Sequence, residues 1–257
     1  MQLTRHRQRS RCSDGVVTGL TDASALAAEA RAGHKQAAAE RAVAWIDSGM
    51  VVGLGSGSTA VFAIRRIGML VQAGTLRDLL GVPTSAASEA EARRHRNPIA
   101  EPGWQGAIDV TIDGADEVDP ALDLIKGGGG ALLHEKVVAQ ASRRLIVVAD
   151  DSKLSTRLGM RCGVPVEVIP FGWRSQARFI ESLGARVDLR SRPDGTPFTT
   201  DEGNFVLDCA FGPLAEASRI DAALAGRAGI VENGIFLGLA TDLIVAGVAG
   251  VRHQSRA

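Results

Sequence analysis

The chain has 257 residues, 45% of them hydrophobic, and is long enough to bury a core without disulfides or a structural metal. Lysine and arginine total 29, as do aspartate and glutamate, so no overall electric field attracts nucleic acid or an anionic membrane. No apolar run reaches the ~18–20 residues that spanning a bilayer requires. We therefore expect no nucleic-acid partner and no membrane association.

The first dozen residues are rich in arginine, poor in acidic residues and not followed by the apolar core of a signal peptide. A disordered or over-long tail and a transit peptide are the alternatives, and we place residues 1–20 outside the fold. Cys12, Cys162 and Cys209 match no zinc or CxxC spacing. Their odd number favours a reducing compartment, and we expect a cytoplasmic protein.

Helical and strand patterns alternate over the first part of the chain. An alanine-rich helix is predicted over 21–48, interrupted near Gly33 so that Lys35 begins a second helix. Alternation of strands and helices predicts a Rossmann-like, mostly parallel sheet with flanking helices, and ligands bind beyond the carboxyl ends of such strands. The predicted strands are 50–54, 80–84, 107–112 and 145–149, and the predicted helices are 60–73, one from about 88, and 130–142.

The pattern changes after residue 163 to strand, helix, two strands, helix and strand. This βαββαβ order predicts a smaller ferredoxin-like α+β domain. The strands are expected at 166–169, 185–190, 204–208 and 229–237, and the helices at 175–183 and 214–224. Residues 241–246 then return to the first sheet. We therefore expect a Rossmann-like domain over 21–163 and 239–257, and a ferredoxin-like domain over 164–238.

A first glycine loop, Gly53-Leu-Gly-Ser-Gly-Ser-Thr59, follows a predicted strand and begins a helix. Backbone N–H groups and the helix dipole converge there, as phosphate binding requires, and three hydroxyl side chains add donors. The sequence has neither the third glycine of GxGxxG nor the GK[ST] of the P-loop. A monophosphate is the predicted ligand, and a tight structural turn is the alternative.

An acidic segment, Asp113-Gly-Ala-Asp116-Glu117, follows the strand 107–112, with Asp119 and Asp123 shortly after it. Carboxylates at the end of a strand bind a hard cation, cap turns, or move protons. The spacing is not that of an EF-hand. A magnesium site stays open on the sequence alone.

A second glycine loop, 127–130, follows Lys126 and leads into a helix that carries Glu135. The spacing of Leu133, Val137 and Ala141 predicts the buried face of this helix and places Glu135 on the opposite side. An exposed glutamate without a function is the alternative to a catalytic base.

Lysine is scarce in this chain, which has four lysines and 25 arginines. Lys35, Lys126 and Lys153 fall at a predicted helix start, a glycine loop and a strand end, whereas Lys136 occupies an ordinary helical position. A planar guanidinium does not replace a compact ammonium in a tight anion site. The first three lysines are therefore candidate anion-binding residues.

Five segments in this order resemble the type A ribose-5-phosphate isomerase family over residues 35–250, although Ser56 stands where that family often has threonine. They are 53–60, 111–117, 124–136, 150–153 and 231–238. The resemblance implies an isomerase of D-ribose 5-phosphate and D-ribulose 5-phosphate in the non-oxidative pentose phosphate pathway. It implies a homodimer or homotetramer that needs no metal or other cofactor.

The resemblance also implies roles for particular residues. Glu135 would be the proton-transferring base, and Asp113, Asp116 and Lys126 the acid–base and polarising groups. The implied substrate contacts are Lys35, Ser56, Gly57, Ser58, Thr59, Asp113, Gly114, Ala115, Asp116, Lys126, Gly127, Gly128, Gly129 and Lys153.

The chemistry of aldose–ketose isomerisation fits these residues independently. The reaction needs ring opening, transfer of a carbon-bound proton and stabilisation of an enediolate. Asp113 or Asp116 is a candidate for the first, Glu135 for the second and Lys126 for the third. The alternatives are a non-catalytic sugar-phosphate sensor, and a sugar-phosphate deaminase or acyl transferase on a related fold.

Overall fold

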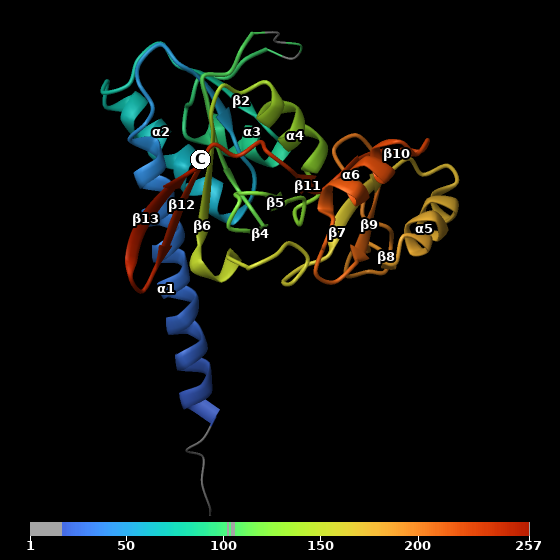
Figure 1. The fold of residues 1–257 in the computed structure, drawn as a ribbon. Coiled ribbons are helices and arrows are strands. Elements are labelled where there is room, and N and C mark those ends of the chain that lie inside the picture. Colours follow the sequence, from blue (N-terminus) through green and yellow to red (C-terminus); the bar gives the residue numbers. More distant parts are fainter. Residues whose placement is uncertain (1–16, 102, 104–105, 257) are drawn as a thin grey trace, which may run out of the picture.

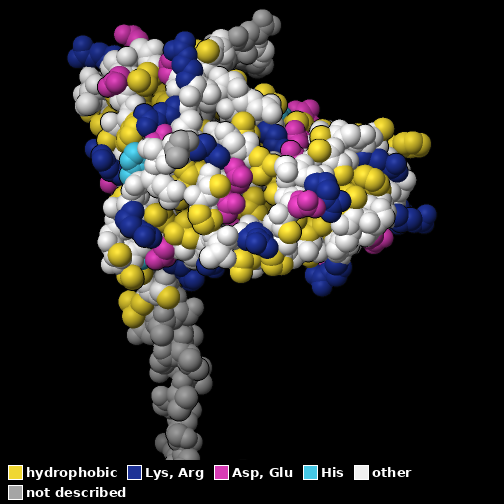
Figure 2. Space-filling view, in the orientation of Figure 1, with side chains coloured by type: hydrophobic (Ala, Val, Ile, Leu, Met, Phe, Trp, Pro, Cys, Tyr) yellow, Lys and Arg dark blue, Asp and Glu magenta, His cyan; other side chains and the backbone are white. Residues whose placement is uncertain are grey.

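The computed structural model describes residues 17–101, 103 and 106–256 (Figure 1). Most of the predicted tail, residues 1–16 with Cys12, lies outside the described residues, whereas 17–20 begin a helix. Within the described residues, no helix is both long and apolar enough to cross a membrane. On the face shown in Figure 2, basic and acidic side chains are interspersed, as the balanced composition predicts.

The larger part of the molecule is built on a six-stranded sheet in the order β13-β12-β6-β3-β1-β2. All neighbouring strands are parallel except β12 and β13. The strands are β1 Val51–Leu54, β2 Leu80–Pro83, β3 Val110–Gly114, β6 Leu145–Asp150, β12 Asp242–Gly247 and β13 Gly250–Ser255. The sequence did not predict β13, because all six of its residues are exposed and it carries no alternating apolar pattern.

Helices α1 (Val17–Val43), α2 (Gly57–Gln72) and α3 (Ala86–Arg94) cover one face of this sheet. The prediction of a break near Gly33 was wrong, because α1 is continuous. Gly33 is exposed, and one glycine costs a helix only about 1 kcal/mol relative to alanine. Lys35 therefore lies within α1 and does not begin a helix.

The other face carries α4 (Leu132–Gln140) and a small antiparallel sheet in the order β11-β5-β4. These strands are β4 Glu117–Val118, β5 Leu124–Ile125 and β11 Ile235–Phe236. Two-residue strands have no readable period, and neither β4 nor β5 was predicted. The predicted strand 229–237 is accordingly divided into β10 (Ile230–Asn233) and β11, with Gly234 between them.

The smaller part contains a four-stranded antiparallel sheet in the order β10-β7-β9-β8. Two helices pack their apolar side chains on it through Ile180, Ile220 and Leu224. The βαββαβ order confirms the predicted fold class, a Rossmann-like α/β sheet with a ferredoxin-like α+β part. The elements are β7 Val164–Val168, α5 Trp173–Ser182, β8 Arg186–Leu189, β9 Phe205–Ala210, α6 Ala217–Ala225 and β10.

Candidate active site

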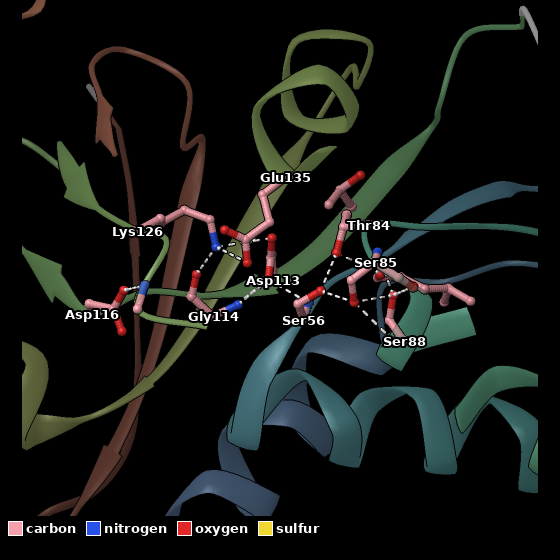
Figure 3. Close-up of polar contacts among 12 residues, drawn as sticks. Ser56, Thr84, Ser85, Ser88, Asp113, Gly114, Asp116, Lys126 and Glu135 are labelled. Atoms are coloured by element: carbon pink, nitrogen blue, oxygen red, sulfur yellow. Dashed lines mark hydrogen bonds and ion pairs between the residues drawn. The ribbon is translucent and has the colours of Figure 1, made fainter. Parts of the chain in front are cut away.

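The candidate site lies beyond the carboxyl ends of β1 and β3, where the first glycine loop and the acidic segment meet (Figure 3). Lys153, which follows β6, lines the same cavity. The second glycine loop reaches the same place from β5, in the small antiparallel sheet. Residues 126–130 therefore do not follow a strand of the parallel sheet, in contrast to the first glycine loop and the acidic segment. The two sheets bring the loops together.

The first glycine loop presents the N-terminus of α2 to the cavity. Ser56 is the N-cap of α2, but its side chain makes no hydrogen bond to the first turn of the helix. Gly57 adopts φ +92°, and a Cβ on Gly55 would lie 2.3 Å from Asp113 Oδ1. The loop therefore requires glycine at both positions and leaves the N–H groups of the helix terminus available to an anion.

The hydroxyl groups of Thr84 and Ser85 hold the side chain of Ser56 in place, and the sequence patterns did not predict this contact. Ser56 Oγ lies 2.7 Å from both Thr84 Oγ1 and Ser85 Oγ, as Figure 3 shows. Ser85 is the N-cap of α3 and forms a capping box with Ser88. Because Thr84 and Ser85 follow the parallel strand β2, the rule that sites form at carboxyl ends would have found them.

Lys35 and Lys153 bring positive charge to the site. Lys35 Nζ, from the middle of α1, donates to Ser58 Oγ at 2.9 Å. Lys153, in the short 3-10 helix Asp151–Lys153 after β6, lines the cavity. The structure brings both predicted lysines to the site, although Lys35 arrives from a different part of its helix than predicted.

Lys126 lies between two carboxylates at the centre of the site. Its Nζ is 3.0 Å from Asp113 Oδ2 and 3.4 Å from Glu135 Oε1, and it also donates to Gly114 O. Asp113 accepts further hydrogen bonds from the N–H groups of Ser56 and Gly114. Asp113 is therefore a fixed counter-ion for Lys126, since it is only 1% exposed and both of its oxygens have partners.

Glu135 is buried with one free oxygen. It is 6% exposed, and its Oε2 has no hydrogen-bond partner among the described residues. The predicted helix face was wrong, because α4 buries Leu132, Glu135 and Ala139 and leaves Val137 57% exposed. Apolar side chains lie on both sides of α4, so their spacing did not determine which side faces inward.

Burial and neighbouring charges shift the pKa values of this pair. Burial, reinforced by the carboxylates of Asp113 and Asp116 and opposed by the Lys126 ammonium, raises the pKa of Glu135 to about 8. For Lys126, the effect of burial is overcome by Asp113 and Glu135, which raise the pKa of the ammonium. Lys126 stays charged, while the pKa of Glu135 is brought from the acidic range to just above neutral pH.

Only part of the acidic segment lines the cavity, and its other carboxylates stabilise neighbouring turns and loops. Asp116 lines the cavity and accepts from Gly128 N–H at 2.7 Å. Glu117 is buried and accepts from four backbone N–H groups, those of residues 159–162. Asp119 caps its own turn, and Asp123 binds Arg256. Among the described residues, no three His, Cys, Asp or Glu side chains form a group that could hold a metal ion.

Lys136 does not occupy an ordinary helical position. It is 6% exposed, and its Nζ donates to Glu232 Oε1 at 2.7 Å and to Asn233 O at 2.8 Å. It also lies 4.8 Å from the centre of the buried Phe236 ring. Lys136 therefore fixes α4 to β10, and nothing in its local sequence indicated this partner 96 residues away.

The structure brings most of the predicted site residues to one cavity, with Asp113 and Lys35 directly behind its wall. The residues that line it are Ser56, Gly57, Ser58, Thr59, Gly114, Ala115, Asp116, Lys126, Gly127, Gly128, Gly129, Glu135 and Lys153. The fold and the cavity, lined by hydroxyl, basic and acidic side chains, define an α/β enzyme for a small polar substrate.

Comparison with known proteins gives the family. Residues 80–250 match the family model described as ribose 5-phosphate isomerase A (phosphoriboisomerase A), and the chain belongs to this family. It is 54% identical over 220 residues to ribose-5-phosphate isomerase A of Chloroflexus aurantiacus, covering 86% of this chain and 92% of that protein. Identity to the protein of the same name from Desulfatibacillum aliphaticivorans is 53% over 223 residues, covering 87% and 97%.

Solved structures agree with this assignment. A D-ribose-5-phosphate isomerase in complex with phospho-erythronic acid superposes with a TM-score of 0.85 at 38% identity, covering 87% of this chain and 98% of that chain. The ribose 5-phosphate isomerase of Plasmodium falciparum gives a TM-score of 0.84 at 35% identity, with the same coverage. These relatives favour the isomerase over the sensor, deaminase and acyl transferase alternatives.

Proposed function

We propose that this protein interconverts D-ribose 5-phosphate and D-ribulose 5-phosphate, as its family membership and site chemistry suggest. The observation that carries the proposal is the pairing of a buried Glu135, with one free oxygen, with the buried Lys126 ammonium. A sugar-phosphate sensor would not require this pair. A buried carboxylate with a raised pKa can accept a proton from carbon.

Phosphate binding would use the N-terminus of α2, Ser58, Thr59 and Lys35. Lys153, which also lines the cavity, would supply a second positive charge. Binding energy from the phosphate orients the carbons that react, at a distance from the phosphate itself.

Ring opening would use Asp116. Of the two candidate aspartates, Asp116 lines the cavity, whereas both oxygens of Asp113 are held by Lys126 and backbone N–H groups. Asp116 would take the proton of the anomeric hydroxyl and return a proton to the ring oxygen, which gives the open-chain aldehyde.

Isomerisation then conserves protons and electrons within the site. Glu135 removes the proton from C2, the electron pair moves to the C1 oxygen, and an enediolate forms. The hydroxyl proton moves from O2 to O1, and Glu135 returns its proton to C1. Because negative charge leaves Glu135 as it appears on the substrate oxygen, the total negative charge beside Lys126 stays the same throughout.

The direct test is to supply purified protein with ribose 5-phosphate in the presence of EDTA and to follow ketose formation and deuterium uptake in ²H₂O. We expect turnover without added metal or cofactor, with solvent deuterium appearing at C1 of the ketose or C2 of the aldose. Ammonia or acyl release without isomerisation would favour the alternatives, and a requirement for metal would make the acidic segment a cation site.

Removing a phosphate contact is expected to raise KM more than it lowers kcat. Lys35→Ala and Thr59→Ala lose contacts that persist from ground state to transition state, so kcat should change little. In each variant, the KM from steady-state kinetics and the inhibition constant of inorganic phosphate should increase by similar factors. A fall in kcat at unchanged KM would contradict this role.

The pH profile is expected to follow Glu135. The base is active when deprotonated, so kcat/KM should rise with pH on a limb centred near 8, where burial places its pKa. A limb near 6 would belong to the second ionisation of the substrate phosphate. A flat profile between pH 7 and 9 would contradict Glu135 as the base.

We further infer a homodimer or homotetramer in the cytoplasm. The exposed edge strand β13, in which Val251 is 44% exposed, and the neighbouring Val248, 95% exposed, support assembly through this sheet edge. The free thiols of Cys162 and Cys209 fit a reducing compartment. Light scattering coupled to size-exclusion chromatography measures the assembly state, and a monomer would contradict it.

A further inference from the structure

The ferredoxin-like part contacts the second glycine loop through Arg190, which directly follows β8. Arg190 Nη1 donates to Gly127 O at 3.0 Å and to Gly128 O at 3.1 Å. Its Nε donates to Asp208 Oδ2 at 2.9 Å, and its Nη2 donates to Asp208 Oδ1. The side chain is only 15% exposed. The guanidinium thus fixes two carbonyl groups of a loop 62 and 63 residues away in the sequence.

Because the two carbonyl groups are fixed, peptide geometry also fixes the direction of the N–H groups that follow them in the chain. In a trans peptide, the C=O of one residue and the N–H of the next point to opposite sides, and the described residues contain no cis peptide bond. Both carbonyls converge on a single nitrogen, so the N–H groups of Gly128 and Gly129 must point away from it. The Gly128 N–H indeed donates to Asp116 Oδ2 at 2.7 Å.

The Gly129 N–H is the donor left over. Among the described residues it has no hydrogen-bond partner, and Gly129 lines the candidate cavity beside Lys126 and Glu135. The trans geometry of the Gly128–Gly129 peptide directs this N–H away from the carbonyl that Arg190 binds. A free N–H group at this position can stabilise negative charge on a substrate oxygen.

The Phe198 ring restricts the conformation of the glycine loop further. A Cβ on Gly130, which has φ +84°, would lie 2.5 Å from the Phe198 ring. The Arg190 guanidinium lies 5.7 Å from the centre of the same ring. Phe198 and Arg190 therefore both restrict the loop, and Arg190 also lines an adjoining cavity with Asp116, Gly128 and Lys153.

We propose that Arg190 is a positioning residue that aims the Gly129 N–H at the oxygen on which the enediolate charge develops. The proposal rests on the proposed isomerase function. Asp208 accepts two hydrogen bonds from the guanidinium and neutralises its charge. Arg190 therefore acts on the site by orienting the peptide groups of the glycine loop. The ferredoxin-like part then contributes to catalysis without touching the substrate.

The test compares Arg190→Met with a matched control, Arg192→Met. Arg192 lies on the same hairpin and 5.9 Å from the same Phe198 ring, but its guanidinium binds Pro197 O and Thr199 Oγ1 and does not contact the glycine loop. Each variant is assayed for kcat, KM and melting temperature. Inhibition constants are measured for inorganic phosphate and for phospho-erythronic acid, whose carboxylate imitates the enediolate oxygens.

Arg190→Met is expected to lower kcat by roughly 10- to 100-fold, somewhat less than the loss of a whole oxyanion donor, because the N–H is misdirected but still present. KM and phosphate inhibition should stay within about twofold, while phospho-erythronic acid should weaken by about the same factor as kcat. Arg192→Met should match wild type. Asp208→Asn should lower kcat by a smaller factor with the same pattern of inhibition constants. This variant provides the test if Arg190→Met does not fold.

Wild-type kcat in both Arg190→Met and Asp208→Asn would overturn the proposal. Equal weakening of inorganic phosphate and phospho-erythronic acid would also overturn it, because that result indicates a general distortion of the site. If wild-type protein itself fails to isomerise ribose 5-phosphate, the proposed function fails, and the outcome is distinguishable from failure of Arg190 alone.

Discussion

Replacing Glu135 by glutamine is expected to lower kcat by roughly 10²- to 10⁴-fold, the usual contribution of a general base, while KM stays close to wild type. Glutamine keeps the volume and the position beside Lys126 but cannot accept the C2 proton. Deuterium uptake from solvent should fall by the same factor as ketose formation, because both depend on the same proton transfer.

A suitable control for this variant is Glu202→Gln. Glu202 is a glutamate near the same helix, paired with His134 at 2.8 Å and 55% exposed at the side chain. Its replacement should leave turnover unchanged. Turnover of Glu135→Gln within threefold of wild type would remove Glu135 from the mechanism, whatever the stability of the variant.

Replacing Lys126 by methionine is expected to affect both catalysis and stability. The developing oxyanion loses its charged donor, which corresponds to roughly 10²- to 10³-fold in kcat. Asp113 and Glu135 lose their buried counter-ion, which costs about 3–5 kcal/mol of unfolding free energy. The pKa of Glu135 should rise further, because the ammonium favours its charged form, and any remaining activity should require a higher pH.

The double variant Lys126→Met/Asp113→Asn separates these effects. Removing the second charge should recover part of the unfolding free energy, measured by urea denaturation, without restoring kcat. Recovery of kcat together with stability would show that Lys126 acts only as a structural partner of Asp113. Unchanged stability in the single variant would contradict the buried ion pair.

Much of this protein could be predicted from local sequence. Short apolar runs alternating with helical periods gave the parallel sheet, and the change of order after residue 163 gave the ferredoxin-like part. The glycine loops and acidic segment at strand ends indicated the site, because parallel strands place their carboxyl ends at one edge. The scarcity of lysine marked Lys35, Lys126 and Lys153, although the same reasoning overlooked Lys136.

Other features depended on partners far away in the chain. The inward face of α4 is set by Lys126 and Phe236, since its own apolar residues lie on both sides. The continuity of α1 through Gly33 was equally hidden, because alanine-rich sequence on both sides outweighs one unfavourable residue.

The sequence by itself determined most of the secondary structure, the fold class and the chemical groups of the site, since these follow from periodicity and residue type within short windows. Only the tertiary structure decided which of those groups are buried, paired or free. The free Oε2 of Glu135, the occupied oxygens of Asp113 and the contact of Arg190 with the glycine loop are examples. Burial and hydrogen bonding depend on packing between segments tens of residues apart, which no local pattern records.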